Sequence, residues 1–550
     1  MGTALGAEGA DTVVNVPAAA AVAREVGTKD LYVRQSSGLV RTVGARTALF
    51  ANLVGMGIIV NFFWITEASA FYPNANLITT VAIGVLINVA VGYVYWMLAS
   101  SMPRSGGDYI FVGRIFHPSV GLGVNLLFSV VFVTWAGLFA YFTAYYAIPT
   151  MLAAYSLAGG GAAAMSAATT LWTSTTDVFV VALITLLIVI LVSLLPTKWI
   201  FRVSVGIFVG SAIIFVIMIG ILLATPQSTF AADFNANPVY GTSYSSLVMA
   251  VPITTTGTFL GIVYTMLSFI GYANSSYYGG EIRGNPTRAQ GLAIFGAPLI
   301  FAALIAGLYA ASYYTFGRGF LIGISSSYFG APGPAWPGPL YLVAVIERVP
   351  ILAAFLSFGL VLTFFGFALI YFVIPTRNLF AWSFDRIFPT FLTKVTNNGV
   401  PWVAVLVLGV SALAALWIQT YTTLFDYATL GYSNFGFWFA VGIVCLAGAL
   451  FPFIRKKSFS QAPAIVRARL GPVPVLTIVG VAAFAASWFV SYAASTGQYL
   501  GITSSAYSVG DLLFLPVVFV IGILVYFVSY AIQKHRGVPV DLISKELPPD

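Results

Sequence analysis

The sequence is poor in charged residues, cysteine and histidine. Lys, Arg, Asp and Glu make up only 7% of its 550 residues, whereas soluble domains carry about a quarter. So few charges cannot solvate a globular surface of this length, which excludes a soluble protein. The single cysteine, Cys445, excludes a disulfide framework and a thiolate metal site. Two histidines, His117 and His535, argue against a histidine-ligated haem, copper or zinc centre.

Apolar residues dominate what is present. Hydrophobic residues make up 59% and aromatic residues 15% of the chain, and the mean hydropathy is +0.96. This composition is typical of a polytopic protein embedded in a lipid bilayer. The net charge of +8 then reflects basic membrane loops and not a basic groove, so we expect no nucleic acid partner.

Uncharged apolar windows of about 18 residues or more mark candidate membrane helices. The eighth of these windows, residues 340–374, is longer than a bilayer needs, which predicts that this helix tilts or protrudes. The windows predict twelve spans, near residues 45–66, 77–99, 119–148, 178–195, 201–224, 257–279, 290–316, 340–374, 402–418, 424–450, 473–495 and 511–533.

The basic residues support this count. With the N-terminus inside, every Lys and Arg except Arg318 and Arg348 falls in a cytoplasmic segment, as expected for membrane proteins. We therefore predict a multi-pass protein of the plasma membrane with both termini in the cytoplasm. Residues 1–43 and 534–550 are expected to be cytoplasmic tails, the first of them flexible, and the longest outer loops are 150–176, 225–256 and 317–338.

Glycines interrupt two of these spans near the middle of the bilayer. Gly55 and Gly57 lie in the first span, and Gly271 lies in the sixth, where small polar residues follow it. Close helix packing through small residues is one explanation. The other is unwound backbone, which membranes tolerate only where it lines a cavity.

The separation of the two sites favours unwound backbone. Five spans separate them, so the two breaks cross the membrane in opposite directions, as in transporters with inverted repeats. The N-termini of half-helices can hold a carboxylate, and freed carbonyls can hold an ammonium or a cation. No span carries a charge at its centre, so the pattern favours a small zwitterion held by backbone groups and argues against an intramembrane carboxylate relay.

Three loop motifs resemble the amino acid–polyamine–organocation permeases. They are Met-Pro-Arg-Ser-Gly-Gly-Asp-Tyr at 102–109, Glu-Ile-Arg-Gly-Asn-Pro at 281–286, and Arg377 with Asp-Arg-Ile-Phe-Pro at 385–389 and Gly-Val-Pro at 399–401. The resemblance implies an all-α fold of twelve transmembrane helices, of the leucine-transporter type, with helices 1 and 6 discontinuous. The implied units are a first repeat at 44–224, an inverted second repeat at 257–450 and two additional helices at 473–533.

The resemblance also implies a substrate site. By the motif match, the backbone amides of Met56, Gly57 and Ile58 would hold the α-carboxylate, and the carbonyls of Leu53 and Ile270 would hold the α-ammonium. Tyr272 and Ala273 would face the side chain of the substrate, with an aromatic residue of the eighth span, Tyr371. The complete set of expected substrate-binding residues is Leu53, Val54, Gly55, Met56, Gly57, Ile58, Phe269, Ile270, Gly271, Tyr272, Ala273 and Tyr371.

Departures from the family pattern bear on the substrate. Met56 stands where the family usually has serine, which removes a hydroxyl but no backbone amide. Leu267 and Ala273 stand where arginine/agmatine exchangers carry tryptophan and glutamate. Because no acid is available to pair a second positive charge, we expect neutral substrates with apolar or aromatic side chains.

Charged residues in the loops are expected to form gates or loop contacts. These are Arg104 with Asp108 after the second span, and Glu281 with Arg283 after the sixth. The Ser/Thr pair of sodium-coupled relatives and the fifth-span lysine of some proton-coupled relatives are both missing. A sodium site built mostly from carbonyls, an exchange mechanism, and proton coupling through Glu281 or Asp108 all stay open, and no metal or other cofactor is expected.

The leading hypothesis is a secondary active transporter of amino acids that works by alternating access, as a monomer or a homodimer. A membrane sensor that binds amino acids without transporting them is one alternative, and a permease for another small amine or a nucleobase is a second. An intramembrane enzyme would need His, Cys or paired carboxylates inside the spans, and the sequence has none there.

Overall fold

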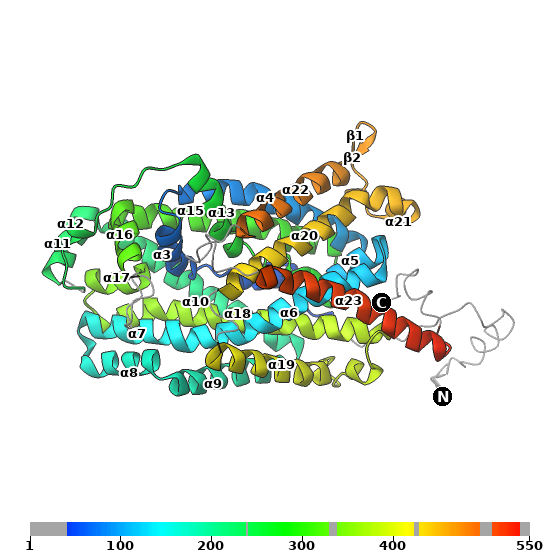
Figure 1. The fold of residues 1–550 in the computed structure, drawn as a ribbon, viewed down its shortest axis with the longest axis horizontal. Coiled ribbons are helices and arrows are strands. Elements are labelled where there is room, and N and C mark those ends of the chain that lie inside the picture. Colours follow the sequence, from blue (N-terminus) through cyan, green and yellow to red (C-terminus); the bar gives the residue numbers. More distant parts are fainter. Residues whose placement is uncertain (1–40, 238–239, 329–337, 423–427, 496–508, 539–550) are drawn as a thin grey trace, which may run out of the picture.

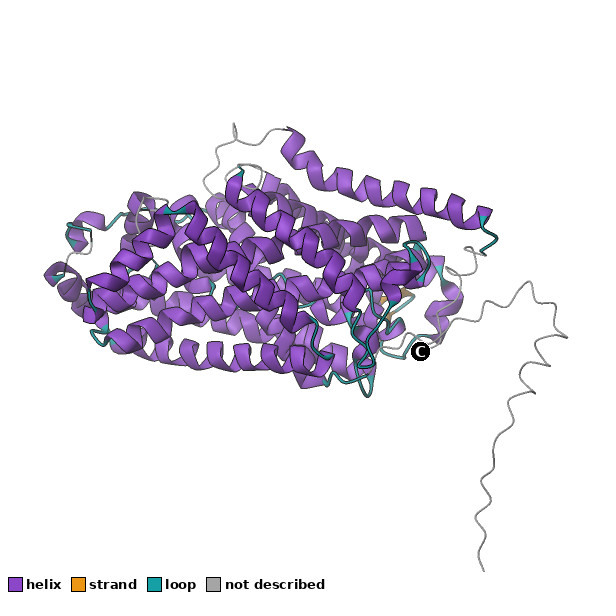
Figure 2. Ribbon diagram, turned by 90° about the horizontal axis from the view of Figure 1, so that it is seen from below, coloured by secondary structure: helices purple, strands orange, loops and turns teal. Residues whose placement is uncertain are grey.

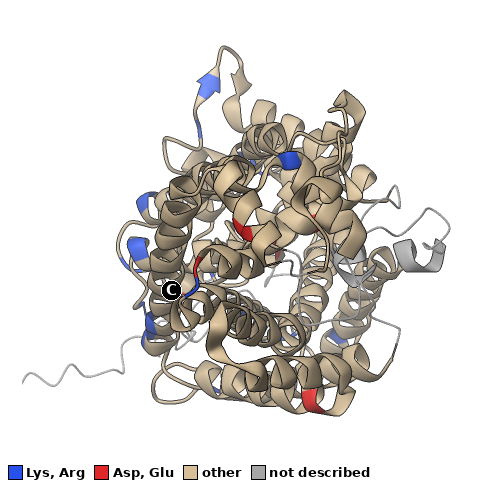
Figure 3. Cartoon of the chain, turned by 90° about the vertical axis from the view of Figure 1, so that its left-hand side faces the viewer, with Lys and Arg blue, Asp and Glu red and all other residues tan. Residues whose placement is uncertain are grey.

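The structure, a computed structural model, describes residues 41–237, 240–328, 338–422, 428–495 and 509–538. These residues form a bundle of helices (Figures 1 and 2). The described residues also include one antiparallel pair of short strands, β1 (Arg469–Leu470) and β2 (Val473–Pro474), in the connection before α22. Figure 3, an end-on view, shows few charged residues along the ribbon.

Eleven helical segments in the described part of the chain are long and apolar enough to cross a membrane. The chain is therefore a multi-pass membrane protein. The segments are α2 with α3 (Ala45–Phe71), α4 (Leu77–Ser101), α6 to η2 (Pro118–Gly160), α9 (Thr175–Ser193), α10 (Thr197–Ala224), α14 to α15 (Pro286–Phe316), α18 (Pro350–Phe384), α19 (Trp402–Tyr421), Asn434–Ile454 of α20 (Ala428–Ile454), α22 (Val475–Ser495) and Phe514–His535 of α23 (Val509–His535).

Each segment overlaps one predicted span, and the predicted span that has no counterpart among them is the sixth, 257–279. Its α-helix, α13, covers only Thr255–Ser268. The chain then turns and continues in two short 3₁₀ helices, η3 (Asn274–Tyr277) and η4 (Gly279–Glu281). Length and composition thus support eleven of the twelve predicted spans, and the remaining one is interrupted.

The predicted bounds of the eighth span, 340–374, are wrong at both ends. A separate helix, α17 (Pro339–Ile346), precedes the long helix α18 (Pro350–Phe384). Val349 is extended, at φ −104° and ψ 105°, because a residue before proline is pushed out of the helical region. Pro350 then begins α18, since the first turn of a helix needs no amide hydrogen there.

The three predicted outer loops contain helices. The predicted loops are 150–176, which is rich in Gly, Ala, Ser and Thr, 225–256, and 317–338, which is rich in Pro and Gly. Alanine is the best helix former, and α8 begins with three alanines. The helices in these segments are α7 (Ile148–Tyr155), η2 (Ser156–Gly160), α8 (Ala162–Thr173), α11 (Gln227–Ala236), α12 (Tyr244–Leu247) and α16 (Arg318–Tyr328).

The broken first span lies in the interior of the bundle. In its most apolar window 94% of the residues are buried, against 22% in α23, whose apolar side chains face outward. Helix α18 packs against α2, α6 and α10, and Figure 1 labels α18 beside α6 and α10. The remaining elements are α5 (Asp108–Ile115), α6 (Pro118–Phe142), η1 (Thr143–Ala147), α14 (Pro286–Gln290), η5 (Gly291–Phe295), α15 (Gly296–Phe316), η6 (Thr390–Thr393) and α21 (Lys456–Gln461).

Candidate functional site

The first span is broken where its glycines predict. Helix α2 (Ala45–Met56) ends at Gly57, which has a φ of +68°, and α3 (Asn61–Phe71) begins four residues later. The Gly57 amide donates to the Leu53 carbonyl at 3.0 Å, which completes the last turn of α2. Within the described part of the chain, the amides of Ile58 and Ile59 donate to no acceptor. Gly55 remains helical, so the break follows the second glycine only.

The sixth span is broken at its central glycine. Helix α13 ends at Ser268, and Gly271 has a φ of +121°, a conformation that favours glycine. The Ile270 amide donates to the Leu267 carbonyl at 3.2 Å, and the Asn274 amide to the Gly271 carbonyl at 3.1 Å. The backbone therefore leaves the α-helical pattern where the sequence predicts unwinding.

The two breaks touch each other. A Cβ atom on Gly271 would lie 2.6 Å from the carbonyl carbon and oxygen of Gly55. A Cβ atom on Gly55 would lie 2.6 Å from the side-chain nitrogen of Asn274. Only residues without a side chain allow the two backbones to come this close.

Two buried asparagines connect the breaks, and the sequence analysis did not identify them as site residues. Asn52 donates to the carbonyls of Tyr272 and, at 2.9 Å, of Ala293, and its side-chain oxygen accepts from the Ser275 amide at 2.9 Å. Asn61 donates to the Gly57 carbonyl at 3.0 Å and accepts from the Ser268 hydroxyl at 2.8 Å. The sequence does show an asparagine on either side of Gly57 within an apolar span. A buried asparagine side chain must find hydrogen-bond partners, so this pattern could have identified both residues.

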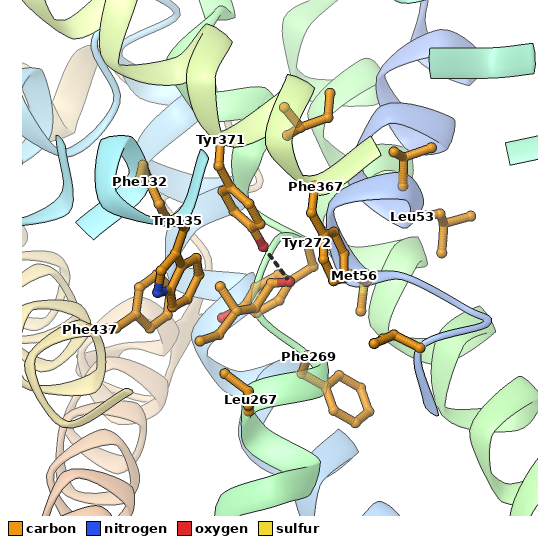
Figure 4. Packing of buried hydrophobic residues seen from close by; sticks show 14 of the residues in the cluster. Leu53, Met56, Phe132, Trp135, Leu267, Phe269, Tyr272, Phe367, Tyr371 and Phe437 are labelled. Carbon is orange, nitrogen blue, oxygen red and sulfur yellow. Dashed lines mark hydrogen bonds between the residues drawn. The ribbon is translucent and has the colours of Figure 1, made fainter. Parts of the chain in front are cut away.

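Tyr371 of α18 lies against both breaks. Its hydroxyl donates to the Gly55 carbonyl at 2.7 Å and to the Ile270 carbonyl at 3.3 Å. Its ring packs against Phe132 and Trp135 of α6, with ring centroids 5.2 and 5.0 Å away. Figure 4 shows the phenol of Tyr371 pointing from these two rings toward the broken sixth span.

The other predicted site residues are buried in and around the breaks, but not all face the same space. The Leu53 side chain lies on the far side of α2 from Tyr371 in Figure 4. The Phe269 ring packs against Phe301 of α15 at 5.4 Å. Tyr272 uses its carbonyl to bind Asn52. Val54, Met56 and Ile58 are buried, and Ala273 is half-buried.

Glu281 forms an ion pair in the interior, and its partner differs from the predicted one. Its carboxylate lies 3.1 Å from Nε of Arg377 on α18, and both side chains are 1% exposed. Arg283 forms no ion pair within the described part of the chain, so the salt bridge expected in this loop is made with Arg377 instead, while the backbones of Glu281 and Arg283 both bond to Val43. The Arg283 amide donates to the Val43 carbonyl, and the Val43 amide donates to the Glu281 carbonyl, each at 3.0 Å. Residue 43, assigned to a flexible tail, is thus held in place.

Asp108 begins α5 and is fully buried beneath η3. Its carboxylate accepts hydrogen bonds from the hydroxyls of Tyr277 and Tyr95. Burial raises the pKa of this carboxyl to about 6, although the two hydroxyls act in the opposite direction. The carbonyl of Arg104 lies against Gly279 of η4, so the structure brings Arg104 and Asp108 to the two consecutive 3₁₀ helices η3 and η4.

Among the described residues, no group of three or more His, Cys, Asp or Glu side chains could hold a metal ion. The polar groups at the two breaks are backbone amides and carbonyls, asparagine amides and one phenol. Such groups can bind a small polar molecule through hydrogen bonds.

The chain is similar to known proteins in two respects. A family model described as amino acid permease matches residues 42–509. The chain is 28% identical over 83 residues to uncharacterized protein 399 of Sulfolobus islandicus rod-shaped virus 1. The aligned region covers 15% of this chain and 21% of that protein. The chain therefore matches about a fifth of the length of this curated relative.

Proposed function

The chain belongs to the amino acid permease family, and we propose that it is a secondary active transporter of neutral amino acids. The family match and the apolar helices support an amino acid transporter of the membrane. The proposal adds the substrate class, the binding groups and alternating access between two inverted repeats, 44–224 and 257–450. The observation that carries it is the direct contact between two unwound segments that expose free peptide groups.

The substrate carboxylate binds at the start of α3. The amides of Ile58 and Ile59 have no acceptor in the described structure, and they precede an eleven-residue half-helix whose N-terminus carries partial positive charge. Gly57, expected to contribute its amide, already donates to Leu53. The proposed carboxylate site therefore keeps only Ile58 of the expected trio of Met56, Gly57 and Ile58, and it adds Ile59.

The substrate ammonium binds to carbonyls at the facing ends of the two breaks. Gly55 lies in the last turn of α2, where carbonyl groups carry partial negative charge. The Ile270 carbonyl comes from the other break, and the Tyr371 hydroxyl bridges both. Leu53 was expected to take part, but its carbonyl accepts from Gly57.

The surroundings favour a neutral substrate with a bulky apolar or aromatic side chain. Phe132, Trp135, Phe367 and Tyr371 form an aromatic wall beside the breaks (Figure 4). A second positive charge on the substrate would find no carboxylate in this wall. The desolvation of an unpaired charge costs several kcal/mol or more, so lysine, arginine and polyamines are disfavoured.

The gate at the end of the bundle that contains α5 is closed in this conformation. Glu281 and Arg377 join η4 to α18, and Asp108 and Tyr277 join α5 to η3. We assign this end to the cytoplasm, in a plasma membrane with both termini inside. Opening toward the cytoplasm then requires these contacts to separate. Transport is coupled to H⁺, coupled to Na⁺, or not coupled to an ion.

Uptake into liposomes tests the proposal. Purified protein reconstituted with labelled leucine or phenylalanine should accumulate label above empty liposomes, and excess unlabelled neutral amino acid should abolish the signal. Labelled arginine, putrescine and uracil serve as controls for the other substrate classes. Binding without uptake would support the sensor instead, and uptake of uracil or putrescine alone would contradict the amino acid assignment.

A further inference from the structure

Tyr371 joins three elements that a transport cycle must move apart. Its ring belongs to α18, and its hydroxyl donates to Gly55 of α2 at 2.7 Å and to Ile270 of the broken sixth span at 3.3 Å. The side chain is 2% exposed. A single phenol hydrogen thus serves two carbonyls that come from different breaks.

These carbonyls are the acceptors that the proposed function assigns to the substrate ammonium. An ammonium has three hydrogens and no acceptor of its own, so it needs carbonyls of this kind around it. The phenol is directed at the same two oxygens and places a neutral donor where a charged one would lie. Because charged donors bind carbonyls more strongly than neutral donors do, an ammonium can displace the phenol.

We propose that Tyr371 is an internal competitor for the substrate ammonium, which holds the empty site closed until a substrate displaces it. This inference rests on the proposed function and adds a residue that sets affinity. In the empty protein the hydroxyl satisfies Gly55 and Ile270 and ties α18 to both breaks. When the substrate binds, the ammonium takes over both carbonyls and releases α18.

The aromatic rings around Tyr371 hold its hydroxyl on these two carbonyl oxygens. Phe132 and Phe139 are stacked on the Tyr371 ring at 5.2 and 6.0 Å, and Trp135 meets it edge-on at 5.0 Å. Phe367 packs against the same ring from α18 at 5.8 Å. The ring is therefore positioned by packing, independently of its hydroxyl, and a phenylalanine at this position keeps the wall while removing the competing donor.

The expected size of the effect follows from one hydrogen-bonded group. A neutral hydrogen bond contributes a modest net free energy to a folded protein, which corresponds to an equilibrium change of about two- to tenfold. Y371F should therefore bind its substrate about two- to tenfold more tightly, because the competing state is weakened while the bound state is not. If the Tyr371 hydroxyl instead bound the substrate directly, Y371F would bind the substrate more weakly than wild type.

The experiment compares wild type, Y371F and Y341F in detergent, with leucine and phenylalanine as probes. Tyr341 is the matched control, since it is equally buried but belongs to a small separate cluster of α7, η2, α8, α17 and α18. Apparent Kd is measured by isothermal calorimetry, and the melting temperature is measured with and without saturating ligand. We expect Y371F to lower the melting temperature of the empty protein only, so that the ligand-induced shift grows, whereas Y341F leaves Kd unchanged.

The outcomes separate this inference from the proposed function. Tighter binding by Y371F together with a larger ligand-induced shift supports the competitor. Equal or weaker binding by Y371F, with wild type binding normally, overturns the competitor but leaves the transporter intact. If wild type binds neither probe while Y371F does, the competitor is supported in a stronger form. If neither protein binds either probe, the proposed function fails and this inference fails with it.

Discussion

The ring of Phe367 on α18 lies directly against the α-carbon of Gly57 in the first break. A Cβ atom on Gly57 would lie 2.7 Å from Cε1 of Phe367, closer still to its Cζ, and 2.9 Å from Cγ2 of Thr363. The first break therefore depends on the absence of a side chain at Gly57, for reasons of space and of its left-handed backbone.

Gly57→Ala should reduce uptake at least tenfold. An L-residue at a φ of +68° is strained by about 1–2 kcal/mol, and the new methyl group displaces Phe367 beside the amides of Ile58 and Ile59. Initial uptake rates in liposomes measure the effect. Gly206→Ala in α10 is the control, since a Cβ there meets no atom within 4 Å. Uptake by Gly57→Ala at the rate of the control would rule out the proposed carboxylate site.

Asn61→Leu should lower stability by about 1–3 kcal/mol, because it leaves the Gly57 carbonyl without its donor and deprives the Ser268 hydroxyl of one acceptor. Uptake should fall as well, since the link between the two breaks is lost. Thermal unfolding in detergent provides the first measurement. Asn237→Ala removes a comparable but half-buried bond to the Asp233 carbonyl, and it should change neither quantity appreciably.

Glu281→Gln should destabilise the protein by about 3–5 kcal/mol, because the buried Arg377 would lose its counter-charge. The double variant Glu281→Gln with Arg377→Met should recover part of that loss, since no unpaired charge remains. Melting temperatures of the two single variants and the double variant form the test. Removal of Arg348, whose pair with Asp233 is 59% and 35% exposed, should cost at most about 1 kcal/mol. Additive losses in the double variant would argue against a coupled gate.

The stability of the protein should depend on pH through Asp108. The pKa of this carboxyl is about 6 in the folded state, above its ordinary value of 3.8, so the folded state binds the proton more tightly than the unfolded state. Its contribution to stability is therefore fully present below about pH 4 and is lost as the pH rises through 6. The hydroxyls of Tyr95 and Tyr277 face it, and an ordinary phenol is neutral in this range.

Melting temperatures between pH 4.5 and 7.5 (roughly the range between the two pKa values) test this dependence. The wild type should lose up to roughly 3 kcal/mol of stability across it, and Asp108→Asn, which keeps a neutral polar group, should give a flatter curve. If both proteins respond to pH equally, Asp108 does not titrate in this interval. The same comparison of uptake shows whether this carboxyl takes part in proton coupling.

The sequence predicted the features that depend on local composition. Hydropathy predicted the membrane helices, because the bilayer selects apolar windows of fixed length. The positive φ values of Gly57 and Gly271 fall within the predicted breaks, because only glycine adopts such a backbone without strain. The loop motifs indicated the family that the family model confirms. Local composition failed at the alanine-rich outer segments and before Pro350, where helix propensity and proline geometry decide the boundaries.

What only the tertiary structure decided is which buried polar groups meet. Glu281 pairs with Arg377 rather than with nearby Arg283, Asn52 reaches Tyr272, and Tyr371 reaches Gly55 across 316 positions of the chain. A periodic pattern shows that a polar residue is buried but not which partner it finds, because that depends on how distant helices cross. Such pairings are specific because a buried polar group without a partner is costly, and they determine what the two broken helices can hold.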